Sequence, residues 1–181
     1  VFSGATSGSG GTLRVGSLST TRIGSGSISF GGTIITDTGG VEVHSPVNFI
    51  GNGVFDTSAA GGDFHFYDTV DGARNATFTL GAGNLYFDEA VGSTTPLSAI
   101  IINSANNFTA TKSFAAASIV QSAGSGTTTF GGAVATTGST GIQITTASVV
   151  RGASITTTGT GPVTFALASG GTLTSVAAGN M

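Results

Sequence analysis

Short runs in which apolar and polar residues alternate recur along the whole chain. GVEVHS, ATFTL, SAIIIN and GIQITT each place apolar side chains at every second position. Successive side chains of a strand point to opposite faces, so this period predicts short strands with one buried face. Glycine, serine and threonine fill the stretches between the runs. Glycine disfavours helix interiors and threonine favours strands, so the pattern predicts an all-β fold.

One glycine–phenylalanine spacing recurs five times. A glycine precedes a phenylalanine by four positions in the pairs Gly26/Phe30, Gly62/Phe66, Gly83/Phe87, Gly126/Phe130 and Gly161/Phe165. An apolar residue follows four positions later in four copies, at Ile34, Val70, Val91 and Val134. The phenylalanines are 36, 21, 43 and 35 residues apart. These distances indicate units of about 18 to 22 residues, a length typical of β-solenoid repeats.

The repeat predicts a parallel β-helix (β-solenoid) of roughly nine coils, right-handed, with residues 1–181 forming a single unit. We expect the five phenylalanines and the four aliphatic residues to point inward and stack from coil to coil. We expect the five glycines to form turns, because glycine reaches positive φ without steric cost.

Three stretches depart from the repeat. Residues 46–80 match it least, so we expect them to be irregular, with a loop leaving the coil near Asp71-Gly72. Asn52-Gly53 predicts a tight turn. The alanines of residues 113–123 leave a short helix as an alternative to a strand.

Composition narrows the class of protein. The chain is 7% charged and 39% hydrophobic with a net charge of −3, which favours a folded chain over a disordered one. It has no cysteine, which excludes disulfides and thiolate metal sites. The sequence contains no run of about 18 apolar residues, so it predicts no membrane-spanning helix. The five cationic residues are scattered, so we expect no nucleic-acid partner.

Two phrases resemble a known family of repeats. TTTFGGAVATTGSTGIQITTAS and LYFDEAVGSTTPLSAIIINSA resemble the β-strand repeats of large bacterial surface proteins, the filamentous-haemagglutinin-like and autotransporter-type adhesins. The matching positions are Phe87, Val91, Gly92, Thr94, Thr95, Pro96, Leu97, Phe130, Gly132 and Val134. The resemblance covers about three-quarters of the chain, from Gly24 to Leu173. It implies an extracellular or cell-surface β-helix that serves as a stalk or adhesive fibre.

The ends of the chain suggest how such a fibre would continue. The sequence starts at Val1 inside an expected strand and stops at Met181 without a polar cap. Repeat arrays need capping units, so we expect a segment of a longer array. Uncapped strand edges recruit further strands, so we also expect end-to-end self-association, with surface glycans as further candidate partners.

The densest polar cluster is GGDFHFYDTVDG. In a strand over 63–67, Asp63, His65 and Tyr67 share the face opposite Phe64 and Phe66. Asp63, Asp68 and Asp71 are the candidate ligands if the loop holds calcium, but their spacing fits no EF-hand. We therefore expect a solvated strand face, with no metal and no cofactor.

Parallel β-helices also carry polysaccharide chemistry, which leaves a second hypothesis. A groove lined by Asp63, His65, Tyr67 and Asp68 would favour a polysaccharide-binding or polysaccharide-cleaving protein. Glycoside hydrolysis needs two acids on one face, whereas adjacent Asp88 and Glu89 point to opposite faces of a strand. We therefore expect no catalytic residues and no enzymatic activity.

Overall fold

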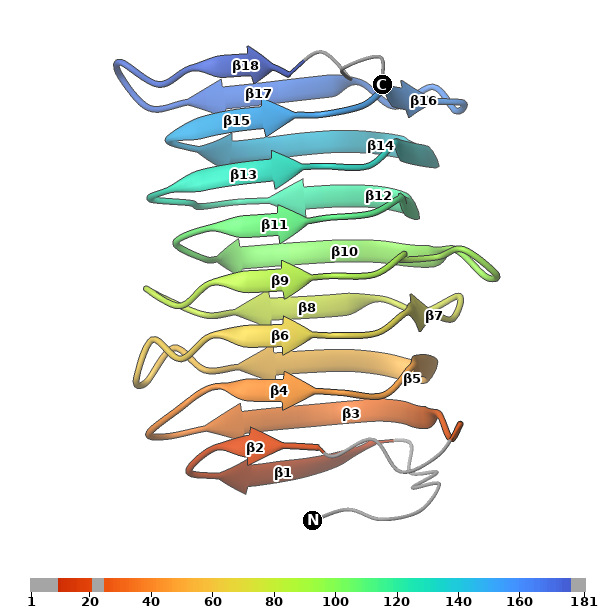
Figure 1. The fold of residues 1–181 in the computed structure, drawn as a ribbon, viewed down its shortest axis with the longest axis vertical. Helices are drawn as coiled ribbons and strands as arrows, with labels where there is room; N and C mark the ends of the chain where they lie inside the picture. The colour runs from red at the N-terminus through yellow and green to blue at the C-terminus, as the bar shows by residue number, and fades with distance from the viewer. Residues whose placement is uncertain (1–9, 21–24, 177–181) are drawn as a thin grey trace.

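The computed structural model describes residues 10–20 and 25–176. These residues form two parallel β-sheets, and no helix occurs among them. Figure 1 shows the chain winding upward from the N-terminus to the C-terminus, with consecutive turns stacked along one axis. The expectation of an all-β, parallel β-solenoid is confirmed.

The strands divide between the sheets as follows. The 10-stranded sheet contains β1 (Gly11–Val15), β3 (Ile28–Thr36), β5 (Val47–Asp56), β7 (Val70–Asp71), β8 (Ala76–Thr79), β10 (Leu97–Ser104), β12 (Phe114–Gln121), β14 (Val134–Thr146), β16 (Ile155–Thr157) and β17 (Val163–Leu167). The 8-stranded sheet contains β2 (Leu18–Ser19), β4 (Val41–Val43), β6 (Phe64–Phe66), β9 (Leu85–Phe87), β11 (Phe108–Ala110), β13 (Thr127–Phe130), β15 (Ser148–Arg151) and β18 (Leu173–Ser175).

The eight strands of the smaller sheet mark eight turns, one fewer than expected. Paired residues in this sheet are 20 positions apart between Phe108 and Thr128 and 24 apart between Val149 and Leu173. Several turns are thus longer than the 22 residues that the sequence suggested as an upper limit, so fewer turns fit into the chain.

Inward-facing residues form columns, because each residue pairs with its equivalent in the next turn. One column of the 10-stranded sheet contains Val47, Val70, Val91, Phe114, Val134 and Ile155. A second contains Leu13, Ile34, Phe55, Phe78, Ile102, Gln121, Ile144 and Phe165. A third, in the 8-stranded sheet, contains Val43, Phe66, Phe87, Ala110, Phe130 and Arg151.

The five repeat phenylalanines therefore do not form the single ladder that the sequence suggested. Phe66, Phe87 and Phe130 share one column and are buried, and the rings of Phe66 and Phe87 stack at 4.9 Å. Phe30 and Phe165 lie in the opposite sheet, near the two ends, and are only half-buried. The 43-residue spacing spans two turns, while the spacings of 36 and 35 connect different sheets.

The five repeat glycines serve a different purpose from the one expected. None of them is among the described glycines with positive φ. A Cβ on Gly62, Gly83, Gly126 or Gly161 would collide with atoms of the preceding turn, whereas Gly26 lies just before β3. Glycine is needed there because two backbones pass too close for a side chain. Positive φ occurs at neighbouring glycines instead, such as Gly61 and Gly81.

Residues 46–80 are regular rather than irregular. They contain β5 to β8, and Asn52-Gly53 lies inside β5 rather than in a tight turn. Gly72, with φ of 115°, does begin a short connection after β7. Residues 114–121 form strand β12 and not the alternative helix, because this segment pairs with strands on both sides and buries alternate residues Phe114, Ala116 and Ser118.

Eight buried polar side chains interrupt the apolar interior of the described residues, and two of them carry an atom without a hydrogen-bond partner. Gln121 lies in an otherwise apolar column, where its Oε1 accepts a 2.6 Å hydrogen bond from Thr128 Oγ1. Neither Gln121 Nε2 nor Thr136 Oγ1 has a hydrogen-bond partner. An unpaired buried polar atom costs free energy, so these positions are weak points of the core.

The central position of Phe87 predicts its contribution to stability. Phe87→Ala should lower the free energy of unfolding by about 3–5 kcal/mol, because it opens a cavity between the stacked rings of adjacent turns. The matched control, Phe30→Ala, truncates the same side chain where it is half-buried and should cost clearly less. Chemical denaturation measures both, and equal losses would contradict the assignment of the core.

The unpaired hydroxyl of Thr136 predicts a stabilising substitution. Thr136→Val keeps the shape and removes the unpaired group, so it should raise the free energy of unfolding by about 1 kcal/mol. Thr128→Val is the control, because it removes a hydroxyl that is hydrogen bonded and leaves Gln121 without that partner. It should destabilise the protein by about 1–3 kcal/mol in the same denaturation assay. A lower free energy of unfolding for both variants would show that the Thr136 hydroxyl has a hydrogen-bond partner.

Candidate aromatic–acidic surface site

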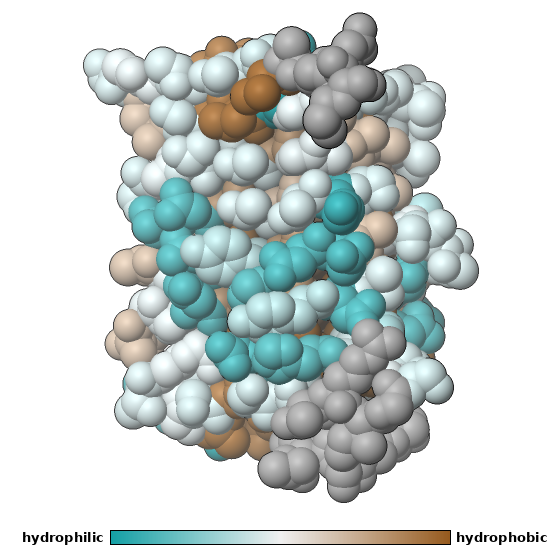
Figure 2. All heavy atoms as spheres, in the orientation of Figure 1, coloured by the Kyte–Doolittle hydropathy of each residue, from teal (hydrophilic) through white to brown (hydrophobic). Residues whose placement is uncertain are grey.

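The outer face of the 8-stranded sheet gathers all the histidine and tyrosine of the chain. The sequence contains two residues of each type. They lie with two acidic residues on consecutive turns, and we call the six residues the aromatic–acidic patch: Glu42, His44, His65, Tyr67, Tyr86 and Asp88. Figure 2 shows strongly hydrophilic residues gathered over the middle turns of the face in view.

Cross-turn register brings the patch together. Glu42 pairs with His65, and His65 pairs with Tyr86, so these three residues form one outward column. Their strand neighbours, such as Phe64 and Phe66, are buried, which places the column on the opposite, outer face. His44, Tyr67 and Asp88 each follow directly after the same three strands.

The centre of the patch is a stack of three rings. The Tyr67 ring packs against His44 at a centroid distance of 4.1 Å and against His65 at 3.7 Å. His65 Nε2 lies 2.8 Å from Asp88 Oδ2, and His44 Nε2 lies 3.7 Å from Glu42 Oε2. Tyr86 is tilted against His65 at 5.0 Å. Rings from three turns are thus held in one arrangement with a carboxylate beside each histidine.

A ladder of amide side chains borders the patch. Asp63 Oδ1 accepts hydrogen bonds from the backbone N and Nδ2 of Asn84, at 2.8 and 2.9 Å. Asn84 Oδ1 accepts from Asn107 Nδ2 at 2.8 Å, and Asn107 Oδ1 accepts from the Thr127 backbone N at 2.8 Å. The ladder fixes Asp63 beside the patch. The ladder also engages the side-chain amide of Asn107 in a hydrogen bond. Asn107 is the first residue of NFT, one of two N-glycosylation patterns in the sequence; the other is NAT at Asn75.

A hollow of about 530 Å³ opens beside the patch. Its polar lining consists of Ser17, Ser19, Glu42, Asp63, His65 and Tyr67. Ser19 Oγ donates a 3.1 Å hydrogen bond to Glu42 Oε2, which orients that carboxylate. The hollow therefore combines carboxylates, hydroxyls and ring edges, and none of the described residues that line it is a lysine or an arginine.

Acidic residues concentrate in the same turns. Seven of the eight lie between Glu42 and Glu89, where Arg74 is the one cationic residue, and none follows Glu89. The pKa of Tyr67 is raised above 10.0 by desolvation and then by the charges of Glu42 and Asp88. Desolvation and the charge of Asp63 raise the pKa of Tyr86. Both phenols thus lie in a region of negative potential.

The candidate calcium ligands are separated and engaged elsewhere. Asp63 holds Asn84, whereas Asp71 Oδ1 accepts hydrogen bonds from the backbone N of Thr94 and Thr95, at 2.8 and 2.9 Å. Asp68 Oδ1 accepts from the Thr69 backbone N. Within residues 10–20 and 25–176, no group of three or more His, Cys, Asp and Glu side chains could hold a metal ion.

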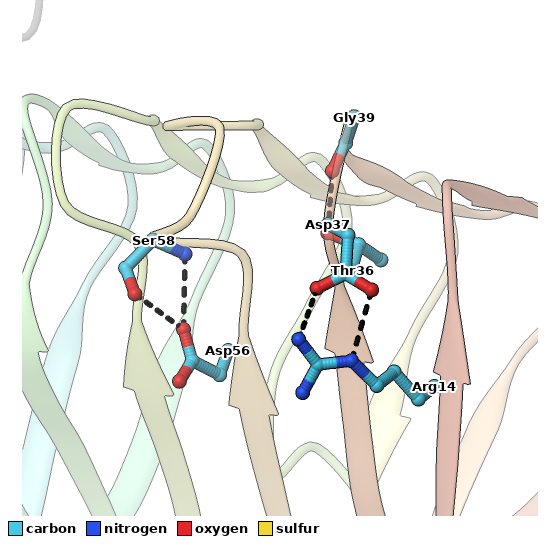
Figure 3. A network of polar contacts seen from close by, with 6 residues as sticks. All are labelled: Arg14, Thr36, Asp37, Gly39, Asp56 and Ser58. Atoms are coloured by element: carbon cyan, nitrogen blue, oxygen red, sulfur yellow. Dashed lines mark hydrogen bonds and ion pairs between the residues drawn. The ribbon is translucent and has the colours of Figure 1, made fainter.

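A second polar network lies at the end of the first strands of the other sheet (Figure 3). Arg14 forms a two-point ion pair with Asp37, at 2.6 and 2.9 Å, and Asp56 Oδ1 accepts two hydrogen bonds from Ser58. Thr36 Oγ1 donates to the Gly39 carbonyl. The contacts of this network tie neighbouring strands and their turns, so we assign it a structural role.

Sequence reasoning placed Asp63, His65 and Tyr67 on one face but missed the other members of the patch. Glu42, His44, Tyr86 and Asp88 come from neighbouring turns, 21 or 23 positions away from their partners. That separation equals the length of a turn, so a correct repeat register would have found them. Asp68 belongs to neither the patch nor the polar lining of the hollow.

Comparisons with other proteins give no match. No protein-family model, curated protein or solved structure matches the chain. Among the described residues, no helix is long and apolar enough to cross a membrane. The function therefore has to be inferred from the fold and from the patch.

The surroundings of Tyr67 predict its ionisation. Glu42→Gln should lower the pKa of Tyr67, because it removes a negative charge that opposes phenolate formation. In a Tyr86→Phe background, the absorbance of the single tyrosinate reports this pKa during an alkaline titration. In a Tyr67→Phe background, Glu42→Gln should leave Tyr86 nearly unchanged, since its pKa responds to Asp63. Equal shifts of both phenols would contradict the geometry.

The same raised pKa values make stability depend on pH. Both phenols are neutral in the folded and unfolded chains below pH 10, so their contribution to the free energy of unfolding is constant there. Above pH 10 the unfolded chain loses its phenol protons first, and the contribution falls as the pH rises through the folded pKa.

Proposed function

We propose that this chain is a rigid, non-catalytic segment of an extracellular stalk or filament, as in bacterial surface adhesins. The observation that carries the proposal is the unbroken parallel stacking of eight turns across the described residues. Stalks of this kind need a stiff, repetitive scaffold that can be extended by further turns. Backbone hydrogen bonds join every turn to the next, so the scaffold does not rely on a thick core.

The two ends have the surfaces that extension requires. Leu173 and Val163 pair with the buried residues Val149 and Ile142, yet they are 52% and 43% exposed. Inward-facing positions are thus uncovered in the last turn that the structure describes. Figure 2 shows hydrophobic residues at this C-terminal end of the rod.

At the N-terminal end, a hollow of about 370 Å³ reaches the interior of the first turns. Leu13, Leu18, Ile28 and Phe30 line it together with buried residues such as Phe55. An apolar hollow at one end and exposed apolar side chains at the other suit head-to-tail stacking, in successive repeats or in separate copies.

A polysaccharide-binding or polysaccharide-cleaving protein remains the second candidate. The hollow beside the aromatic–acidic patch favours binding. Cleavage has less support, because Asp88 and Asp63 are already engaged by His65 and Asn84.

Association should depend on the exposed end. We expect filaments or a concentration-dependent increase in mass in negative-stain microscopy and analytical ultracentrifugation. Leu173→Lys should abolish this association, because it places a charge where the next turn would pack. Val54→Lys is the matched control, since Val54 is 39% exposed on the side of the rod, and it should still associate. A monomer at every concentration, or loss of association in both variants, would contradict head-to-tail stacking.

A further inference from the structure

We propose that the last described turn of this solenoid binds the first turn of a second copy of the same chain in one defined register. In this register, β17 and β18 of one copy pair with β1 and β2 of the next copy as if they belonged to consecutive turns of one chain. The inference rests on the head-to-tail association proposed above and specifies it. That association alone fixes neither the rotation of one copy about the axis nor the alignment of its strands.

Three inward columns contain one residue in every turn that the structure describes. The first column contains Leu13, Ile34, Phe55, Phe78, Ile102, Gln121, Ile144 and Phe165. The second contains Leu18, Val41, Phe64, Leu85, Phe108, Thr128, Val149 and Leu173. The third contains Gly11, Gly32, Gly53, Ala76, Ile100, Ile119, Ile142 and Val163. A second copy placed in register continues all three columns at once.

The residues that end these columns complement in shape those that begin them. Val163 and Leu173 are exposed in the last described turn. At the other end, Gly11 and Leu18 line the apolar hollow of about 370 Å³. No described atom lies within 4 Å of the position that a Cβ on Gly11 would take. Val163 of one copy therefore meets open apolar space beside Gly11 of the next.

The spacing between the two sheets also matches at the two ends. Leu13 and Leu18 are five positions apart, and Phe165 and Leu173 are eight positions apart. The equivalent residues of the six turns between them are five to nine positions apart. The end turns thus fall within the range of the interior turns, so both sheets can pair across the junction together.

Backbone pairing and charge favour this alignment over others. Described strands of consecutive turns pair in parallel, which makes the junction an ordinary parallel pair. A slip of one residue would turn Val163 and Leu173 to the outer face. The outward pairs at the junction are Thr12 with Thr164, Arg14 with Ala166, and Ser19 with Thr174. No like charges meet in these pairs.

Disulfide cross-linking of the intact chain tests the register. The chain has no cysteine, so introduced cysteines are its only thiols. The matched double variants are Ser19→Cys with Thr174→Cys, and Thr12→Cys with Thr164→Cys, all at exposed positions. Neighbouring parallel strands are about 4.8 Å apart, within the Cα distances of about 4.4–6.8 Å that a disulfide spans. Mild oxidation should give a ladder of linked oligomers from both variants on a non-reducing gel.

Crossed pairs of the same cysteines are the controls. Ser19→Cys with Thr164→Cys, and Thr12→Cys with Thr174→Cys, keep the same exposed positions but combine strands of opposite sheets. They should remain unlinked under the same oxidation. Adding Leu173→Lys to the first matched variant should remove its ladder. Thermal unfolding checks that each variant folds.

The outcomes separate the register from the association itself. Ladders from the crossed pairs would overturn the register. Association in analytical ultracentrifugation without a ladder from either matched pair would also overturn it, while leaving head-to-tail stacking intact. A monomer at every concentration would refute both proposals.

Discussion

Parallel backbone pairing between consecutive turns is the constraint on which the structure depends. Each residue lies directly above its equivalent one turn earlier, so a side chain meets a partner of similar position at strand spacing. Inside the rod this produces columns such as Val70, Val91 and Val134, in which apolar residues pack on one another. At the corners the same closeness leaves no room for a Cβ, which explains glycine at positions such as Gly83. One geometric rule thus accounts for both the apolar and the glycine positions.

The sequence predicted the fold class because alternation and repeated glycine–phenylalanine spacing are local signals. It did not predict the register, because a turn of the 8-stranded sheet varies between 20 and 24 residues and residues from different sheets share the same local motif. Phe30 and Phe66 share the same spacing to a preceding glycine and a following aliphatic residue, yet they belong to opposite sheets. The prediction of nine turns, where the structure has eight, has the same origin. A variable repeat hides which residues are stacked until the connections between strands are known.

The patch shows the same limit for function. Asp63, His65 and Tyr67 were visible as one strand face because they alternate within five residues. Their partners Glu42, His44, Tyr86 and Asp88 depend on pairing across turns, which no local pattern reveals. Asp68, grouped with them by closeness in sequence, belongs elsewhere. Local patterns therefore predict which side of a strand is polar, while register decides which polar groups meet.

Register also imposes a condition on charge that the patch satisfies. Like charges in adjacent turns would face one another across strand spacing and repel. In the column of Glu42, His65 and Tyr86, and in that of His44, Tyr67 and Asp88, no carboxylate lies directly above another. Asp63 is followed by the amides of Asn84 and Asn107, which donate toward it and along the column. In these three columns the acidic residues Glu42, Asp63 and Asp88 are therefore stacked on a ring or an amide and not on another carboxylate. A rod assembled from such turns can therefore carry a chemically distinct surface along its side.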